Sequence, residues 1–143
     1  INDNIPIEDG IDVISVDSLA FKRYLDTAVL LKKSIVVITD NDRDIAGSIT
    51  TKYKDYSKYD FIKFCYEEDE SLNTIEPSVA KVNYTEEKWD NFIKIITKRS
   101  LKDYEFNTVV KFMENNKTEW SLRVFDSENC IDYPKYILDA IEE

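Results

Sequence analysis

The chain has 143 residues, 43% of them hydrophobic, which is enough for one domain with a hydrophobic core. Its formal net charge of −10 argues against a free-standing nucleic-acid binder with a basic face. It has no histidine, and its two cysteines, Cys65 and Cys130, stand far apart, which excludes zinc sites and histidine-based catalysis. We expect both cysteines to be reduced core residues of a cytoplasmic protein. No apolar run is long enough to span a membrane, and no signal peptide is visible.

The first part of the chain predicts a strand, a helix and a second strand. Residues 1–10 are polar and irregular, which is typical of a connector. The chain starts without methionine, so we expect a piece of a longer protein, and a trimmed terminus explains the same start equally well. A short β-branched run from Ile11 to Val16 predicts a strand, and an apolar stripe from Leu19 to Leu31 predicts a helix. The five residues from Ile35 to Thr39 are all β-branched, which favours a buried central strand. This order predicts a right-handed βαβ unit with parallel strands.

The next elements continue the alternation of helix and strand. We expect a helix over residues 45–53, a strand over residues 61–66 and an acidic loop over residues 67–70. Pro77 suits the first turn of another helix, so Thr74 and Glu76 lie where the chain leaves the sheet and enters that helix. Taken alone, Glu76 is also explained as an acidic residue that favours a helix N-terminus.

From Glu86 onward the apolar residues follow helical spacing, and Asn115 and Asn116 interrupt them. We interpret these stripes as core. The predicted fold class is α/β, with a mostly parallel sheet flanked by helices and a C-terminal helical region. We expect one domain over residues 1–143, with a sheet-containing part over residues 1–85 and a helical part over residues 86–143.

The central strand ends in the acidic stretch Asp40-Asn41-Asp42. Ligands of open α/β sheets bind beyond the carboxyl ends of the strands. In an extended segment Asp40 and Asp42 would face the same way, and their repulsion would be relieved by a divalent cation such as Mg²⁺ or Mn²⁺. An acidic turn, with Asp44 as the cap of the next helix, explains the same residues without a metal.

Four separated motifs follow one another in the chain. They are G-I-D-V-I-S-V-D-S-L-A-F-K-R-Y-L from Gly10, V-V-I-T-D-N-D from Val36, L-N-T-I-E-P-S from Leu72 and N-N-K-T-E-W-S-L from Asn115. Together they resemble the C-terminal TOPRIM domain of OLD-family ATP-dependent endonucleases, a family that includes the nuclease subunit of the Gabija anti-phage system. The resemblance covers nearly the whole chain from Gly10.

The resemblance implies a metal-dependent DNA endonuclease that uses two ions, Mg²⁺ or Mn²⁺. It implies that Asp40 and Asp42 bind one ion, that Thr74 and Glu76 help to build the second site, and that Lys117 approaches the scissile phosphate. Complete family members also carry an N-terminal ABC-type ATPase domain, and we expect a homo-oligomer for the full-length protein. This chain contains no phosphate-binding G-x-x-x-x-G-K-[ST] loop.

One departure from the family pattern bears on activity. TOPRIM domains begin with a strand that ends in a catalytic glutamate, and here that strand and the helix after it are missing upstream. Glu8 precedes a different strand and lies in the connector, so it does not replace that glutamate. We therefore expect an incomplete site in the isolated chain unless another segment supplies the carboxylate.

Two other readings stay open. A small domain with a net charge of −10 is also typical of a non-enzymatic protein-interaction module or an acidic mimic of DNA. A receiver-like phosphoacceptor domain also has aspartates at strand ends, but it leaves the late helical region and the Thr74–Pro77 segment unexplained.

Overall fold

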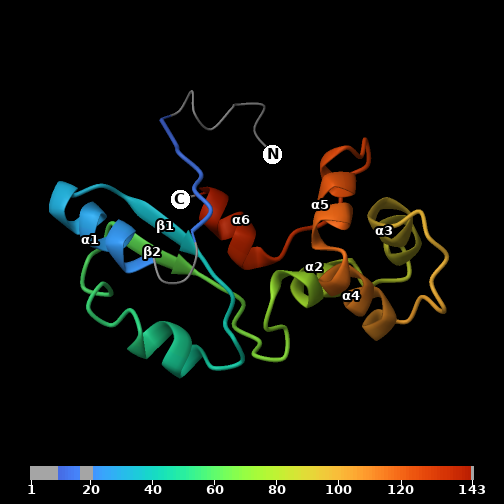
Figure 1. Cartoon of the computed structure of the whole chain (residues 1–143), viewed down its shortest axis with the longest axis horizontal. Coiled ribbons are helices and arrows are strands. Elements are labelled where there is room, and N and C mark those ends of the chain that lie inside the picture. The colour runs from blue at the N-terminus through green and yellow to red at the C-terminus, as the bar shows by residue number, and fades with distance from the viewer. Residues whose placement is uncertain (1–9, 17–20, 143) are drawn as a thin grey trace.

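The structure is a computed structural model and describes residues 10–16 and 21–142. It is a mixed α/β protein, as the sequence predicts (Figure 1). In chain order its elements are α1 (Phe21–Leu31), β1 (Ile35–Ile38), the π-helix η2 (Ala46–Thr51), β2 (Ile62–Cys65), α2 (Ile75–Asn83), α3 (Trp89–Ile96), α4 (Phe106–Asn115), α5 (Lys117–Phe125) and α6 (Lys135–Glu142).

Strands β1 and β2 pair in parallel, with Ile35 opposite Ile62 and Ile38 opposite Cys65. This confirms the predicted strands over residues 35–39 and 61–66, each somewhat shorter than expected. The prediction that the first of them is a buried central strand is wrong, because Val36 and Ile38 are 37% and 47% exposed and the described sheet has only two strands. One hydrophobic cluster packs on the sheet, and its buried members are Leu25, Val37, Tyr53, Tyr56 and Ile62. Since these side chains come from α1, both strands and the turns after η2, the cluster holds the first half of the chain together.

The helices α2 to α5 surround a second hydrophobic cluster. Its buried members are Val79, Ala80, Phe92, Ile93, Ile95, Ile96, Val109, Phe112, Met113, Trp120 and Ile131. The interpretation of the apolar stripes from Glu86 onward as core is therefore confirmed for most of these buried residues. It is wrong for Leu122 and Phe125, which are 57% and 86% exposed. The helix α2 belongs to this cluster although it precedes residue 86.

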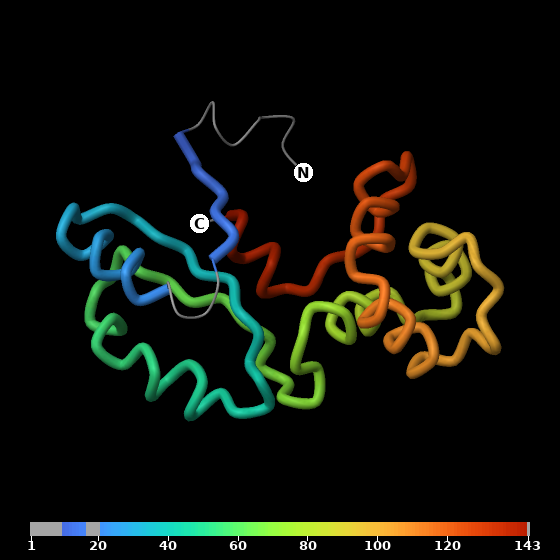
Figure 2. The backbone as a smooth tube through the Cα atoms, viewed as in Figure 1, coloured from blue at the N-terminus to red at the C-terminus, as the bar shows by residue number. Residues whose placement is uncertain are grey.

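The last helix, α6, returns to the sheet and packs against both β1 and β2. Figure 2 shows this return, with the end of the chain crossing from the helical lobe to the side of the sheet. The two hydrophobic clusters therefore do not follow the boundary expected at residue 85, because α2 joins the helical lobe and α6 joins the sheet.

The predicted strand from Ile11 to Val16 is wrong, because residues 11–16 have no regular secondary structure. The side chains of Ile11, Val13 and Ile14 are 54%, 86% and 55% exposed. A strand needs a partner strand, and among the described residues β1 pairs only with β2. The predicted βαβ unit with this first strand is therefore also not formed. The predicted helix cap at Asp17 and Ser18 lies outside the described residues.

The helix predicted over residues 45–53 is present only as the π-helix η2, followed by turns. Its start is fixed by Asp44, whose Oδ1 accepts a hydrogen bond from Gly47 N–H at 2.9 Å, so the predicted capping role of Asp44 is confirmed. A Cβ atom at Gly47 would collide with Asp44 Oδ2, so a side chain there would displace the Asp44 carboxylate.

The prediction that both cysteines lie in the core is wrong for Cys130, which is exposed in the segment between α5 and α6, whereas Cys65 is half-buried.

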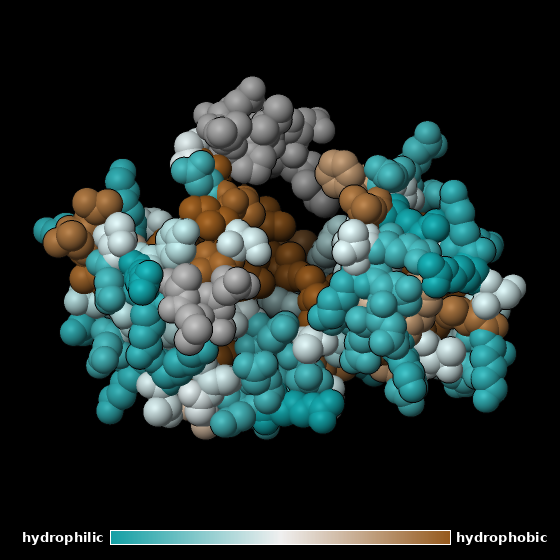
Figure 3. Space-filling model, viewed as in Figure 1, coloured by the Kyte–Doolittle hydropathy of each residue, from teal (hydrophilic) through white to brown (hydrophobic). Residues whose placement is uncertain are grey.

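Figure 3 shows hydrophobic surface gathered near the middle of the face that is turned to the viewer, over the sheet and α6. Its exposed contributors include Val36 and Ile38 of β1 and Leu138 and Ile141 of α6. None of the described helices combines the length and the apolar character that a membrane span requires.

Candidate active site

The loop after β1 is anchored by Asn41, which is completely buried. Its Nδ2 donates to the carbonyl oxygens of Glu67 and Asp69, at 2.8 and 3.1 Å, and its Oδ1 accepts from Arg43 N–H at 2.9 Å. These bonds tie the loop after β1 to the loop after β2. The two loops leave neighbouring parallel strands, so Asn41 fixes the edge of the sheet at which a site is expected. Sequence reasoning assigned Asn41 no role.

Asp40 lies at this edge beside the N-terminus of α2. Its carboxylate accepts a hydrogen bond from the backbone N–H of Ile75, the first residue of that helix. Although Asp40 is partly exposed, desolvation raises the pKa of its carboxyl group, and the negative charges of Glu76 and Asp42 raise it further. The positive charge of Lys117 and the hydrogen bond from the Ile75 N–H lower this pKa. Asp40 therefore shares one electrostatic neighbourhood with three of the predicted site residues.

Asp42 is not part of an extended segment, as was expected. Its φ is 54°, and that of Arg43 is 61°, so two successive residues adopt the left-handed conformation. The chain turns immediately after Asn41, and the alternation that would align Asp40 and Asp42 does not apply. Asp42 is exposed and still close enough to raise the pKa of Asp40. Strained backbone of this kind is concentrated at functional sites.

Thr74 and Glu76 lie at the start of α2, where the sequence predicts them. Thr74 occupies the N-cap position, but its hydroxyl makes no capping hydrogen bond. Its Oγ1 is buried without a hydrogen-bond partner. The Glu76 side chain is 1% exposed, and its Oε2 is also buried without a partner. A buried carboxylate is costly unless it is paired, so the environment of Glu76 requires a cation.

Lys117 supplies one such charge. It is the first residue of α5, as predicted, and its Nζ lies 3.1 Å from Glu76 Oε1. The Lys117 side chain is 63% exposed, so the ammonium reaches the buried carboxylate from the solvent side. A lysine in the first turn of a helix is unfavourable for the helix dipole, and the ion pair with Glu76 offsets that cost.

Tyr136 of α6 also belongs to this neighbourhood, and sequence reasoning missed it. Its side chain is buried and forms a hydrogen bond with Ser78, and Asp40 and Glu76 lie close enough to influence it. Desolvation, followed by the negative charges of Asp40 and Glu67, raises the pKa of the phenol to about 12. In the sequence Tyr136 appears only as part of an apolar stripe, since its partners come from helices far away along the chain.

The oxygen atoms of Asp40, Thr74 and Glu76 are of the type that a hard divalent cation prefers as ligands. The unpartnered Thr74 Oγ1 and Glu76 Oε2 are oxygen atoms, as are the carboxylate atoms of Asp40. The electrostatic repulsion between Asp40 and Glu76 would be relieved by a positive ion. Within residues 10–16 and 21–142, however, no three acidic, cysteine or histidine side chains are arranged to hold a metal ion together. The chemistry of these residues therefore fits a divalent ion when the Thr74 hydroxyl is counted among its ligands.

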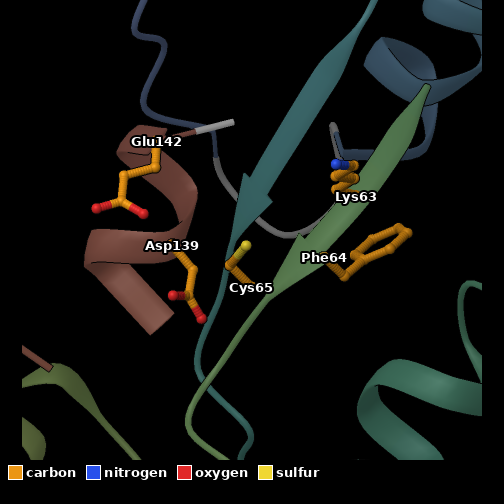
Figure 4. A pocket seen from close by; sticks show the side chains of 5 residues that line it. All are labelled: Lys63, Phe64, Cys65, Asp139 and Glu142. Carbon is orange, nitrogen blue, oxygen red and sulfur yellow. The ribbon is translucent and has the colours of Figure 1, made fainter. Parts of the chain in front are cut away.

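The cavities in the described part of the chain include one beside the sheet and one beside α2. The larger, of about 590 Å³, lies between β2 and α6 and is lined by Lys63, Phe64, Cys65, Asp139 and Glu142 (Figure 4). None of the predicted site residues lines it. The other, of about 420 Å³, adjoins the start of α2 and is bordered by Arg43, Asn73 and Pro77. Each of these three is the chain neighbour of a predicted site residue.

Comparison of the chain with models of known protein families, with curated proteins and with solved structures found no match.

Proposed function

We propose that the chain carries a divalent-metal-dependent DNA endonuclease site of the TOPRIM type, which hydrolyses phosphodiester bonds with two Mg²⁺ or Mn²⁺ ions. The observation that carries the proposal is the approach of Asp40, Glu76 and Lys117, which are far apart in the sequence. These residues come from the end of a strand and the starts of two helices. Asp40, Glu76 and Lys117 also lie in three of the four motifs that resemble OLD-family nucleases.

The buried oxygen atoms support this proposal over a purely structural ion pair. A structural pair would satisfy both oxygens of Glu76, because an unpaired polar atom in the interior costs free energy. Here Glu76 Oε2 and Thr74 Oγ1 have no partner. Both atoms belong to residues for which the resemblance implies a metal-site role. In this proposal Asp40 and Asp42 bind one ion, while Glu76 and Thr74 bind or orient the second.

Lys117 has a separate role in the proposed mechanism. Bound divalent ions would activate a water molecule and neutralise charge on the phosphate. Lys117, which is mostly exposed while its ammonium contacts Glu76, is able to contact a phosphate oxygen from the solvent side and stabilise the developing negative charge. The absence of histidine agrees with this mechanism, because no imidazole base is required.

In its biological setting we propose that this chain is the catalytic-domain fragment of an OLD-family ATP-dependent nuclease of the cytoplasm, acting in anti-phage defence. The N-terminal ATPase domain and the upstream glutamate that this proposal requires would belong to other segments of a longer, oligomeric protein. This proposal of a biological setting rests on the resemblance of the four sequence motifs alone.

Plasmid nicking in Mn²⁺ and in Mg²⁺ tests the proposal. We would compare this chain, a form extended upstream by the missing strand, and the extended form with Asp42→Ala. We expect nicking by the extended form and its loss in the Asp42→Ala variant. Failure of the short chain alone would place the missing carboxylate upstream. Absence of nicking by every form, with either metal, would contradict the proposal.

One observation favours the non-enzymatic alternative, an acidic interaction module or DNA mimic. No three acidic side chains of the described residues are arranged to hold a metal ion, and the net charge is −10. A mimic requires acidity that is spread over the surface. It would bind a basic protein equally well after Asp42→Ala, whereas the nuclease would lose its activity.

A further inference from the structure

The cleft of about 420 Å³ beside the candidate site is lined by apolar, amide, cationic and acidic side chains. It lies between the loop that leads into α2, the α2 helix and one side of α4. Its volume falls within the roughly 300–1,000 Å³ that is typical of sites for small organic ligands. Because its rim includes the chain neighbours of Asp42, Thr74 and Glu76, a molecule in the cleft would lie next to anything bound at the candidate site.

We propose that this cleft binds one unpaired nucleotide of the substrate, next to the phosphodiester bond that is cut. The inference rests on the proposed function and adds a substrate class to it, DNA with unpaired nucleotides at or near the cleavage position. A single nucleotide presents a flat apolar ring, a polar base edge and a phosphate. The cleft offers a matching surface to each of these three parts.

The apolar side of the cleft includes Phe106 and Val110, one turn apart on α4. Phe106 is held in place by ring contacts with Tyr84 and Trp89, at centroid distances of 5.2 and 6.3 Å. A fixed aromatic side chain is the usual platform for an unstacked base, because every base has an apolar face. A paired base keeps this face inside the helical stack, so the platform favours unpaired nucleotides.

Two side-chain amides, those of Asn73 and Asn107, provide for the base edge. An amide carries both a donor and an acceptor group and is able to form two hydrogen bonds to one base. Asn73 lies in the loop before α2 and Asn107 in the first turn of α4, so the two approach the cleft from different elements. Among the residues that the structure describes, neither amide forms a hydrogen bond with the protein.

Two cations, Arg43 and Lys81, line the same cleft and are suited to the phosphate. Arg43 is held in a left-handed conformation, with φ of 61°, directly after the acidic stretch. In a chain with ten more acidic than basic residues, two cations beside a metal-site candidate form a local exception to the overall charge.

The cleft also contains two carboxylates, Asp69 and Glu114. Asp69 Oδ1 already accepts hydrogen bonds from the N–H and the hydroxyl of Ser71, at 2.9 and 2.6 Å. This atom is therefore occupied within its own loop. Glu114 is exposed near the end of α4, and a carboxylate there is able to accept from the exocyclic amino group of a base.

Binding of a fluorescein-labelled 12-nucleotide single strand, followed by fluorescence anisotropy in EDTA at low salt, tests the inference separately from cleavage. The test variants are Asn107→Ala and the double variant Arg43→Gln/Lys81→Gln. The control is Lys102→Gln/Lys111→Gln, which removes the same charge from exposed lysines outside the cleft. This control matters because general electrostatic attraction to DNA depends on charge alone.

We expect the wild type to bind the single strand more tightly than a blunt duplex of equal length. We expect Asn107→Ala and the cleft double variant to weaken single-strand binding by about tenfold, the scale of lost hydrogen bonds to a base edge or lost contacts to a phosphate. The control should differ from the wild type by less than about threefold. Equal effects of the cleft and control double variants, together with wild-type binding by Asn107→Ala, would overturn the inference.

The two proposals fail in different ways. Metal-dependent nicking with unaltered single-strand binding by the cleft variants would overturn the nucleotide site and leave the nuclease standing. Loss of binding in the cleft variants without any nicking would retain a nucleotide site and overturn the nuclease. Circular dichroism of each variant verifies that it is folded.

Discussion

Lys117 Nζ lies 3.1 Å from Glu76 Oε1, and the two residues stand in the first turns of α5 and α2. The lysine is 63% exposed and the glutamate 1% exposed. The pair therefore places a solvent-facing cation on a carboxylate that has no other charged partner among the described residues. This relationship leads directly to a test by substitution.

The variant Lys117→Met should be less stable than the wild type, because it leaves the buried Glu76 carboxylate unpaired. We expect a loss of about 1–3 kcal/mol, below the range for fully buried pairs since the lysine is largely exposed. Urea unfolding at neutral pH measures this change. The variant should also lower the nicking rate of the active form by about 10²-fold, because Lys117 no longer stabilises charge on the phosphate.

The matched control for this variant is Lys111→Met, which removes an exposed lysine from α4. It should change the unfolding free energy by less than about 0.5 kcal/mol. Equal stability of Lys117→Met and Lys111→Met would show that the ion pair with Glu76 contributes nothing.

The variant Asp40→Asn should be more stable than the wild type in EDTA at neutral pH. The pKa of Asp40 is raised in the folded state, so ionisation of this carboxyl group makes folding less favourable. The stability that the protonated carboxyl group contributes is therefore lost as the pH rises through that raised pKa. Asparagine carries no charge and still accepts from Ile75 N–H. We expect a gain of up to about 1 kcal/mol after solvent screening.

Calorimetry of Asp40→Asn and the wild type at several pH values tests this sign. The difference should vanish below the ordinary aspartate value of 3.8, where the wild-type carboxyl is neutral. Asp60→Asn, at an exposed position, serves as the control. A lower melting temperature for Asp40→Asn at neutral pH would contradict the repulsion between Asp40 and Glu76.

The variant Asn41→Ala should be strongly destabilised. It removes three hydrogen bonds of a fully buried side chain and leaves two loop carbonyls without their donor. We expect a loss of about 2–4 kcal/mol in urea unfolding. Asn115→Ala removes one exposed amide bond to the Lys111 carbonyl and should cost less than about 1 kcal/mol. Similar losses in the two variants would argue against the anchoring role of Asn41.

The hydroxyl of Tyr56 donates to Asp26 Oδ1 at 2.7 Å and so joins the turns after η2 to α1. Desolvation and this bond raise the pKa of Tyr56 from 10.0 to about 12. The stability contributed by the protonated phenol is complete below pH 10 and is lost as the pH rises toward 12. The variant Tyr56→Phe should therefore be less stable than the wild type at pH 7, by about 1–2 kcal/mol.

This deficit should shrink between pH 10 and pH 12, which urea unfolding at pH 7, 9 and 11 would follow. Tyr24→Phe, at an exposed position of α1, should show no deficit at any of these values. A deficit that is the same at pH 7, 9 and 11 would rule out the phenol of Tyr56 as its source.

The elements of this fold were predictable where a local pattern was sufficient. The β-branched run from Ile35 identified a strand, and the apolar stripes after Glu86 identified core helices, because periodicity reports which face is buried. The burial of that strand was not predicted correctly, since Val36 and Ile38 are 37% and 47% exposed. The segment from Ile11 to Val16 has an equally good strand pattern but no partner strand, and pairing depends on tertiary context that no local pattern contains.

The candidate site was predictable in its residues and not in its geometry. Asp40, Glu76 and Lys117 were identified from sequence motifs, and their electrostatic contact depends on how α2 and α5 pack. The turn at Asp42 was not predicted, because the alternation of side chains along β1 was assumed to continue beyond the end of that strand. Asn41 and Tyr136 were missed because their roles depend on partners 26 or more residues away.

The central claim is that Asp40 and Glu76 both belong to a site that binds divalent cations. Titration of the metal-free chain with Mn²⁺, followed by isothermal calorimetry and by the loss of the free Mn²⁺ resonance signal, tests it directly. We predict saturable binding that is weakened at least tenfold in Glu76→Gln and in Asp40→Asn and unchanged in the control Asp60→Asn. Equal binding by the wild type, Glu76→Gln and Asp40→Asn would contradict the claim, as would the absence of any saturable binding.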